Sequence, residues 1–456
     1  MHPVRKLAIT WLLLVSTGCS SYSAPLRGAP EGTWQGQITW RGASLECSVR
    51  FRSDGDSLRA WFNSPDLLLL GMPLDSVRFK QRRIRFVTTD DHPIAFEGTV
   101  AGDSITGTVR IGAVPGVVEP GAGGVPPRLT LRRTIVLPPP YAIERVTFRS
   151  DSVELGGTVY LPEAPPHTLP GVVILQGSSA NLRDAYHFYA DHFARTGFAV
   201  LVFDKRGHGE SGGDYGAATY EDLARDAAAA VARLRAHPRV ASGRVGLWGL
   251  SQGAFLAPMV AQRVDSLAFV VAISPPGMVV GLTSAYQDSV RLVATGFGTA
   301  DANAAATLDR RLLDWLGSGH DRARLAAELE RVADTPWRRA SALPRYLPSG
   351  ARLESWYWRG RTLDPLPSWR ALELPALVVF GAADELLPAP SSAANIERAL
   401  GQGGNVDHTV KTFPGANHVL RTLPLVAGGA WDWPRAAPGY LELVTEWMRA
   451  HARSNP

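Results

Sequence analysis

Between residues 28 and 135, apolar and polar residues alternate at a period of two in short runs. The clearest of these runs cover residues 33–40, 46–51, 76–79, 83–87 and 105–111. Turn-forming sequences such as Ser53-Asp54-Gly55 separate them. Alternation of this length is the pattern of a strand with one buried face. The sequence therefore predicts a small antiparallel all-β domain at residues 28–135, either a sandwich or a barrel.

A second pattern of apolar and polar residues follows a Pro-rich linker at residues 136–143. Across residues 144–452, two entry strands at 145–150 and 153–161 precede apolar runs that alternate with helical patterns. Strands are predicted at 171–175, 199–203, 245–248, 267–273, 376–380 and 408–413, and helices at 184–196, 220–236, 252–263 and 439–451. Continuous apolar runs are typical of strands buried on both faces. This order predicts an α/β domain with a doubly wound, mostly parallel sheet.

The alternation stops between residues 275 and 373. Helical patterns at 300–316 and 322–333 and the aromatic run 356–358 occupy this stretch. An insertion of this size between two strands predicts a helical cap over the strand ends, where open α/β sheets bind ligands. Four cap tryptophans are expected to be core residues, and an apolar acyl pocket lined by them is the alternative: Trp315, Trp337, Trp356 and Trp358.

The strongest chemical signal is Gly249-Leu250-Ser251-Gln252-Gly253, which joins a predicted strand to a predicted helix. A serine on such a sharp turn is exposed at the edge of the sheet, and the two glycines let strand and helix pass closely. We predict Ser251 as a nucleophile. The backbone N–H of Gln252, at the start of the helix, is the expected donor to an oxyanion. A serine in an ordinary Gly-rich turn is the alternative interpretation.

From about residue 144 to 450 the chain resembles the α/β-hydrolase superfamily. The resemblance is carried by the 249–253 turn, the loops that contain Asp384 and His418, and the loop at residues 204–211. Within the superfamily, the sequence is most similar to exported bacterial esterases of the dienelactone-hydrolase and serine-aminopeptidase-like groups. The resemblance implies acyl transfer by a serine nucleophile.

In this fold the catalytic partners follow the nucleophile in the order acid, then histidine. Three histidines follow Asp384. His408 opens a predicted strand and His451 lies in the last helix, whereas His418 lies in a loop after the last strand. We therefore predict His418 as the general base and Asp384 as the acid that orients it. Glu385 is the rival for the acid.

A second oxyanion donor is expected from the loop that follows the strand at 171–175. Gln176-Gly177-Ser178-Ser179 forms this loop, and the N–H of Ser178 is the predicted donor. Gln176 replaces the histidine that is common at this place in the family, but a backbone donor does not depend on that side chain. Asp204 precedes Ser251 in the chain and is expected to be a structural acid within its own turn.

No cofactor or metal is expected. The sequence from Gly207 to Gly212 matches a dinucleotide-binding pattern, but a loop continues where the phosphate-binding helix should begin. His187 and His192 are five residues apart on a predicted helix, so they do not share a face as metal ligands would. The predicted chemistry requires neither group.

Composition indicates a globular protein, with 45% apolar and 20% charged residues among 456. The formal net charge is +5, but no dense run of Lys and Arg indicates a nucleic-acid partner. Residues 1–18 carry Arg5 and Lys6, then an apolar run, then small residues, which is typical of a secretory signal peptide.

The sequence Ser16-Thr17-Gly18-Cys19 resembles a bacterial lipoprotein signal, in which Cys19 would be lipidated. Ser16 departs from the usual leucine, and ordinary cleavage near residues 21–23 is the alternative. We expect export from the cytoplasm to the bacterial cell envelope, either as a secreted protein or attached to a membrane through Cys19. Cys47 would then have no disulfide partner and is expected to be buried.

Together these features predict a serine hydrolase that cleaves carboxylic esters through an acyl-enzyme intermediate. A serine peptidase that acts on short peptides is the first alternative, and it would need a site for a charged terminus. Glu354 and Arg359 in the cap are candidates for that site. A catalytically inert lipoprotein that binds a ligand through its β domain is the second alternative. The sequence makes no prediction of the oligomeric state.

Overall fold

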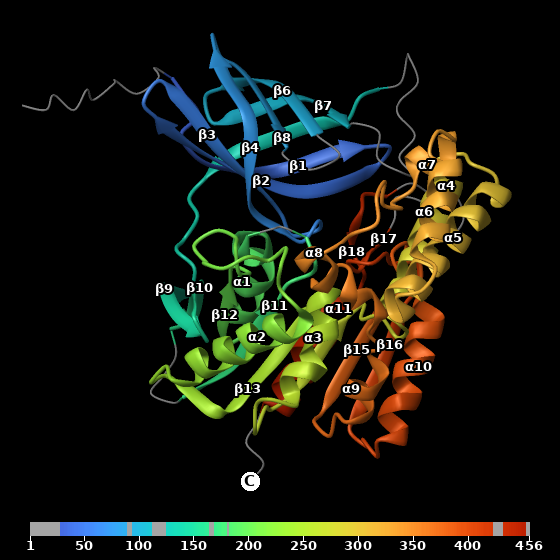
Figure 1. Ribbon diagram of the computed structural model, residues 1–456. Helices are drawn as coiled ribbons and strands as arrows, with labels where there is room; N and C mark the ends of the chain where they lie inside the picture. Colours follow the sequence, from blue (N-terminus) through green and yellow to red (C-terminus); the bar gives the residue numbers. More distant parts are fainter. Residues whose placement is uncertain are drawn as a thin grey trace, which may run out of the picture.

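The N-terminal domain is a closed antiparallel barrel (Figure 1). The computed structural model describes residues 28–88, 94–111, 125–163, 168–179, 182–422 and 432–452, so the predicted signal peptide and Cys19 lie outside the described residues. The barrel strands are β1 (Gly32–Trp40), β2 (Ala43–Asp54), β3 (Ser57–Ser64), β4 (Leu69–Lys80), β5 (Arg83–Thr88), β6 (Ile94–Ala101), β7 (Ser104–Ile111) and β8 (Arg128–Thr134). β1 pairs with both β2 and β8, which closes the sheet. The predicted all-β domain is confirmed, as a barrel rather than a sandwich.

Side chains that point inward fill the barrel. Trp34, Phe86 and Phe96 are almost fully buried, and the last two stack with their ring centroids 4.5 Å apart. Cys47 belongs to the same core, and burial raises the pKa of its thiol to about 12. The period-two pattern of the sequence therefore corresponds to one face packed inside and one face exposed.

An eight-stranded sheet forms the second domain, in the order β16-β15-β14-β13-β11-β12-β10-β9. Its strands are β9 (Tyr141–Ser150), β10 (Val153–Pro162), β11 (Leu169–Leu175), β12 (Ala199–Phe203), β13 (Val240–Leu250), β14 (Val270–Ile273), β15 (Ala376–Gly381) and β16 (His408–Phe413). β10 is antiparallel to its two neighbours, and the other pairings are parallel. The predicted α/β architecture is confirmed, although β9 begins within the stretch predicted as linker.

Helices cover both faces of the sheet. The helices around it are η1 (Arg183–Tyr186), α1 (His187–Arg195), α2 (Tyr220–Arg235), α3 (Gln252–Ala261), α10 (Ala389–Gln402) and α11 (Tyr440–His451). Val173 and Leu175 of β11 pack with α2, α3 and α10, whereas Val172 and Ile174 pack with α1 and α11. Successive residues of a strand therefore pack into two separate cores, one on each face of the sheet, which explains the uninterrupted apolar runs.

A helical cap lies between β14 and β15, as predicted. It consists of α4 (Val280–Ala294), α5 (Thr299–Ser318), α6 (Arg322–Arg331), α7 (Pro336–Ala340), α8 (Ala351–Glu354), η2 (Arg359–Thr362) and α9 (Leu366–Arg370). Trp315, Trp337 and Trp358 belong to a separate cap core, whereas Trp356 packs against Tyr215. Three of the four cap tryptophans are thus core residues. Among the described residues, no helix combines the length and apolar character needed to span a membrane.

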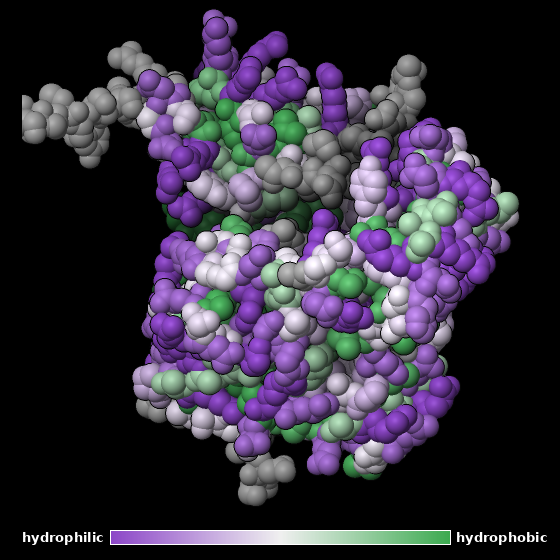
Figure 2. Space-filling model, viewed as in Figure 1, coloured by the Kyte–Doolittle hydropathy of each residue, from purple (hydrophilic) through white to green (hydrophobic). Residues whose placement is uncertain are grey.

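Each domain contributes one large apolar side chain to the core of the other. Leu68, in the turn between β3 and β4, joins the buried cluster of the second domain that contains Tyr186. In return, Trp433 joins the barrel core, with its ring centroid 6.4 Å from that of Trp40. The N–H of Ala436 also donates to the carbonyl oxygen of Asp66 at 2.8 Å. The barrel therefore packs directly against the second domain, and apolar surface is visible where they meet (Figure 2).

Candidate active site

Ser251 occupies the sharp turn between β13 and α3. Its backbone has φ of 54° and ψ of −112°, a left-handed conformation that is costly for a residue with a side chain. Its N–H donates to the carbonyl oxygen of Ile273 at the end of β14, at 2.8 Å. A Cβ placed on Gly249 would lie 2.4 Å from backbone atoms of Gly253, and one on Gly253 would lie 2.0 Å from the carbonyl oxygen of Leu175. The two glycines are thus required by close backbone approach.

Replacing Gly253 with alanine should destabilise the protein. The new Cβ collides with backbone rather than with a flexible side chain, so we expect a loss of about 3 kcal/mol or more. Thermal melting should show a fall of roughly 6 °C or more. Gly243→Ala, where a Cβ meets nothing within 4 Å, is the matched control. Equal melting temperatures for the two variants would contradict this account of the turn.

The ends of β15 and β16 bring Asp384 and His418 together. Nδ1 of His418 lies 2.8 Å from Oδ2 of Asp384, and both side chains are buried. Oδ1 of Asp384 accepts the N–H groups of Leu386 and Leu387 at 2.8 and 3.0 Å. Because Nδ1 donates to a carboxylate, the neutral imidazole has its lone pair on Nε2. Within the described ranges, Nε2 has no hydrogen-bond partner, so it is available to accept a proton.

Ser274, a residue that sequence analysis missed, links the histidine loop to the Ser251 turn. Its hydroxyl donates to the carbonyl oxygen of His418 at 2.8 Å, and Ile273 just before it accepts the N–H of Ser251. Two consecutive residues at the end of β14 therefore hold the backbone of the predicted nucleophile and of the predicted base. In the sequence, this role was indicated by a polar residue that directly follows a buried strand.

The two other carboxylates that were considered, Glu385 and Asp204, do not contact the ring of His418. The carboxylate of Glu385 is exposed, and its Oε2 lies 3.4 Å from the backbone nitrogen of His418 rather than on the ring. Asp204 is buried and bound by the guanidinium of Arg183. A Cβ on Gly209 would meet the Asp204 carboxylate, so the glycine-rich loop wraps around a carboxylate of its own chain. That arrangement gives the loop a structural role.

The oxyanion loop, defined as residues 176–179, lies beside the turn that carries Ser251. A Cβ placed on Gly177 would lie 3.7 Å from Cβ of Ser251. The N–H of Gly177 donates to the hydroxyl of Tyr186 at 2.6 Å. The N–H groups of Ser178 and Gln252 have no acceptor among the residues that the structure describes. The two predicted donors are therefore available to bind an oxyanion.

The cap contacts the site from two sides. On one side, Tyr286 of α4 donates to the carbonyl oxygen of Asp384 at 3.0 Å. On the other, the indole N–H of Trp356 donates to the carbonyl oxygen of Tyr215 at 3.0 Å. These two bonds join the cap to the loops that follow β15 and β12.

The two histidines considered as metal ligands have separate surroundings. His192 lies 2.8 Å from the hydroxyl of Thr445 on α11, and the ring of His187 packs near Gly71 of the barrel. Burial lowers the pKa of both rings. Within the described ranges, no three His, Cys, Asp or Glu side chains are grouped as metal ligands would be.

Comparison with protein families identifies a match within the second domain. The model of the X-Pro dipeptidyl-peptidase (S15) family matches residues 151–400. That stretch includes Ser251 and Asp384 and ends before His418.

Two curated relatives are each 30% identical to the chain over a limited stretch. One is thiohydrolase aneE of Aspergillus aculeatus, over 126 residues that cover 27% of this chain and 39% of that protein. The other is quorum-quenching protein AidA of Acinetobacter baumannii, over 137 residues that cover 30% and 45%. The chain thus spans less than half the length of either relative.

Several solved structures are similar to part of the chain. A hypothetical protein of Pseudomonas aeruginosa is 21% identical, with 70% of this chain and 96% of that chain covered and a TM-score of 0.44. Est1E of Butyrivibrio proteoclasticus, solved with ferulic acid, is 19% identical, with 67% and 96% covered and a TM-score of 0.41. An esterase of Pyrococcus furiosus is 20% identical, with 60% and 83% covered and a TM-score of 0.39.

Proposed function

Because the chain belongs to the X-Pro dipeptidyl-peptidase (S15) family, with an α/β-hydrolase fold, we propose that it is a serine hydrolase that cleaves carboxylic esters. The observation that carries the proposal is the buried pair of His418 and Asp384, 2.8 Å apart. Nε2 of His418 has no hydrogen-bond partner within the described ranges, and the consecutive residues Ile273 and Ser274 bind the backbone of Ser251 and of His418. A nucleophile, an acid and a histidine base, in this order along the chain, are the parts that acyl transfer requires in this fold.

In the proposed mechanism, Oγ of Ser251 attacks the acyl carbonyl while Nε2 of His418 takes its proton. Asp384 stabilises the imidazolium that forms. The N–H groups of Ser178 and Gln252 bind the oxyanion, and each such donor typically contributes about 3 kcal/mol to the transition state. Collapse of the tetrahedral intermediate expels the alcohol, which takes the proton from His418. Water, deprotonated by His418, then releases the acid from the acyl-enzyme.

A serine peptidase is the second candidate, and the family match is the observation that favours it. A peptidase that removes short N-terminal fragments needs a free charged group for the peptide terminus. Glu354 and Arg359 do not support this role, because they form an exposed ion pair with each other at 2.9 Å. Esters also have better leaving groups than amides and demand less of the site. We therefore rank ester hydrolysis first.

Parallel assays of two substrate series test the proposal. The first is a graded series of p-nitrophenyl acyl esters, and the second consists of aminoacyl and X-Pro dipeptidyl nitroanilides. We expect ester turnover to exceed nitroanilide turnover, with a chain-length profile that reports the size of the acyl pocket. The reverse order would assign the protein to the peptidases. An absence of turnover in both series would favour a binding role instead.

A further inference from the structure

Lys205, in the loop after β12, is one of the few buried cations among the described residues, and only 7% of its surface is exposed. Its Nζ donates to the carbonyl oxygen of Gly177 at 2.6 Å and also to that of Ser179. The hydroxyl of Tyr215 lies 3.0 Å from the carbonyl oxygen between them, that of Ser178. Lys205 therefore holds two carbonyl groups of the oxyanion loop, and the hydroxyl of Tyr215, which also lies 2.8 Å from Oε1 of Gln252, contacts the third.

One of these contacts determines the direction of the predicted oxyanion donor. The carbonyl of Gly177 and the N–H of Ser178 belong to the same planar peptide group. In a trans peptide these two groups point in opposite directions, and the described chain has no cis peptide bond. By holding the carbonyl of Gly177, Lys205 makes the N–H of Ser178 point away from itself. Ser251 lies beside Gly177, and the N–H of Ser178 has no acceptor among the described residues, so it is available to an acyl group bound at Ser251.

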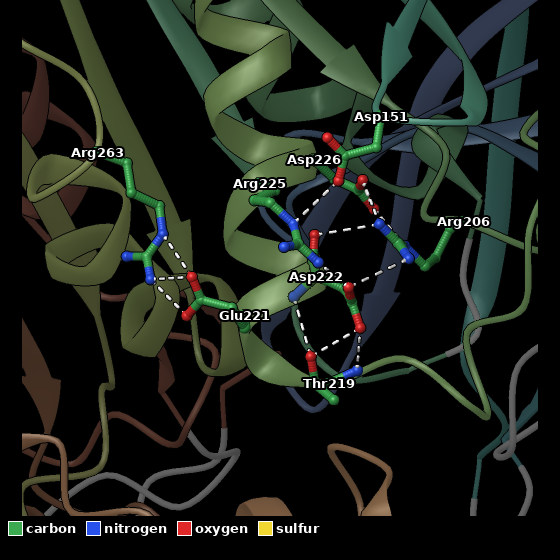
Figure 3. A network of polar contacts seen from close by, with 8 residues as sticks. All are labelled: Asp151, Arg206, Thr219, Glu221, Asp222, Arg225, Asp226 and Arg263. Atoms are coloured by element: carbon green, nitrogen blue, oxygen red, sulfur yellow. Dashed lines mark hydrogen bonds and ion pairs between the residues drawn. The ribbon is translucent and has the colours of Figure 1, made fainter. Parts of the chain in front are cut away.

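The charge of Lys205 has no carboxylate partner among the described residues. Asp204, its neighbour in the chain, is paired with Arg183. Asp226 of α2 is bound by Arg206 through two contacts of 2.7 Å, and Figure 3 shows this guanidinium beside the carboxylates of α2. The charge of Lys205 is met instead by carbonyl oxygens and by the ring of Tyr215, whose centroid lies 4.6 Å from Nζ.

We propose that Lys205 is a positioning residue that aims and polarises the Gly177–Ser178 peptide as the second oxyanion donor. This inference rests on the proposed acyl-transfer function. A charged hydrogen bond to the carbonyl withdraws electron density from the peptide, and the N–H of the same peptide becomes a stronger donor. The effect is realised when negative charge develops on the substrate oxygen. Loss of the lysine should therefore lower kcat more than it raises KM.

The pH dependence of kcat distinguishes this role from a purely structural one. Burial lowers the pKa of the Lys205 ammonium to about 8, so the charge is lost in mildly alkaline solution. Burial raises the pKa of Tyr186 and Tyr215 far above this range, and that of Tyr220 to about 12. Of these neighbouring groups, only Lys205 changes charge between pH 8 and 10. Activity should accordingly fall as pH rises through about 8.

The experiment compares wild type with Lys205→Met, Lys205→Arg and the exposed-lysine control Lys80→Met on one p-nitrophenyl ester. Lys205→Met should lower kcat by about 10- to 100-fold at pH 7, change KM by less than about threefold, and lack the alkaline fall in activity. Lys205→Arg, which stays charged, should keep its activity beyond pH 9. Lys80→Met should match wild type in kcat and in pH profile.

A kcat of Lys205→Met equal to that of Lys80→Met would overturn the inference, as would an unchanged alkaline fall in Lys205→Arg. If Lys205→Met does not fold, the pH profile of Lys205→Arg decides alone. Labelling of Ser251 by a fluorophosphonate separates this result from the proposed function. If wild type is labelled and active and the kcat of Lys205→Met is unchanged, only the role of the lysine is contradicted. Wild type without Ser251-dependent turnover contradicts both.

Discussion

Replacing Ser251 with alanine should lower kcat for ester hydrolysis by about 10⁴- to 10⁶-fold. Ser251 is the residue just before α3, and its hydroxyl is the group at this turn that can form the acyl-enzyme. Oxyanion donors and substrate binding remain in the variant, so a small residual rate over water is expected. The measurement is initial-rate hydrolysis of a p-nitrophenyl ester.

Covalent labelling gives an independent readout of the same prediction. A fluorophosphonate should add to the peptide that contains Ser251 in wild type and should leave the Ser251→Ala variant unlabelled, as shown by mass spectrometry. Ser152→Ala, in the exposed turn between β9 and β10, is the matched control and should retain both labelling and turnover. Turnover that persists in Ser251→Ala would assign the nucleophile to another residue.

The elements that could be predicted from sequence are those whose hydrophobic period is regular and local. The strand at 171–175 and the helix at 220–236 correspond closely to β11 and α2. Three barrel strands, β3, β6 and β8, were not predicted. In β3, Trp61 points outward and is only half-buried, so the alternation of apolar and polar residues is blurred. Closure of the barrel pairs Thr33 with Thr134, a contact that no local pattern encodes.

Two of the longer helices, α4 and α10, escaped prediction for a different physical reason. In α4 the buried positions include Thr283 and Asp288, which interrupt an apolar stripe. In α10 the buried face contains Ala389, Ser392 and Ala399, whose small side chains give a weak hydrophobic signal. Both helices form because neighbouring segments cover these positions, which is information about packing rather than about the local sequence.

The candidate site was predictable where chemistry requires a fixed residue type. The order of nucleophile, acid and histidine gave Ser251, Asp384 and His418, and the structure places the last two 2.8 Å apart. The supporting residues were not predicted, because each acts through a backbone group distant in the sequence. Lys205 holds carbonyl groups 26 and 28 residues away, and Ser274 holds one that is 144 residues away. Only the folded chain brings these pairs together.

Replacing Asp384 with asparagine should lower kcat by about 10⁴-fold without unfolding the protein. Both carboxylate oxygens of Asp384 act as acceptors: Oδ1 for the N–H groups of Leu386 and Leu387, and Oδ2 for Nδ1 of His418. Asparagine has one acceptor and one donor in the same space. If its oxygen accepts the two backbone N–H groups, its NH₂ group faces Nδ1. The imidazole must then carry its proton on Nε2, and it can no longer accept the proton of Ser251.

The opposite orientation of the asparagine would set its NH₂ group against two backbone N–H donors, which is unfavourable in a buried site. The variant therefore favours the wrong tautomer of His418. The rate of fluorophosphonate labelling should fall together with kcat, because both steps need Ser251 to lose its proton, while the melting temperature changes little. Glu385→Gln tests the rival acid under the same conditions. A large loss in Glu385→Gln, with Asp384→Asn within about tenfold of wild type, would transfer the orienting role to Glu385.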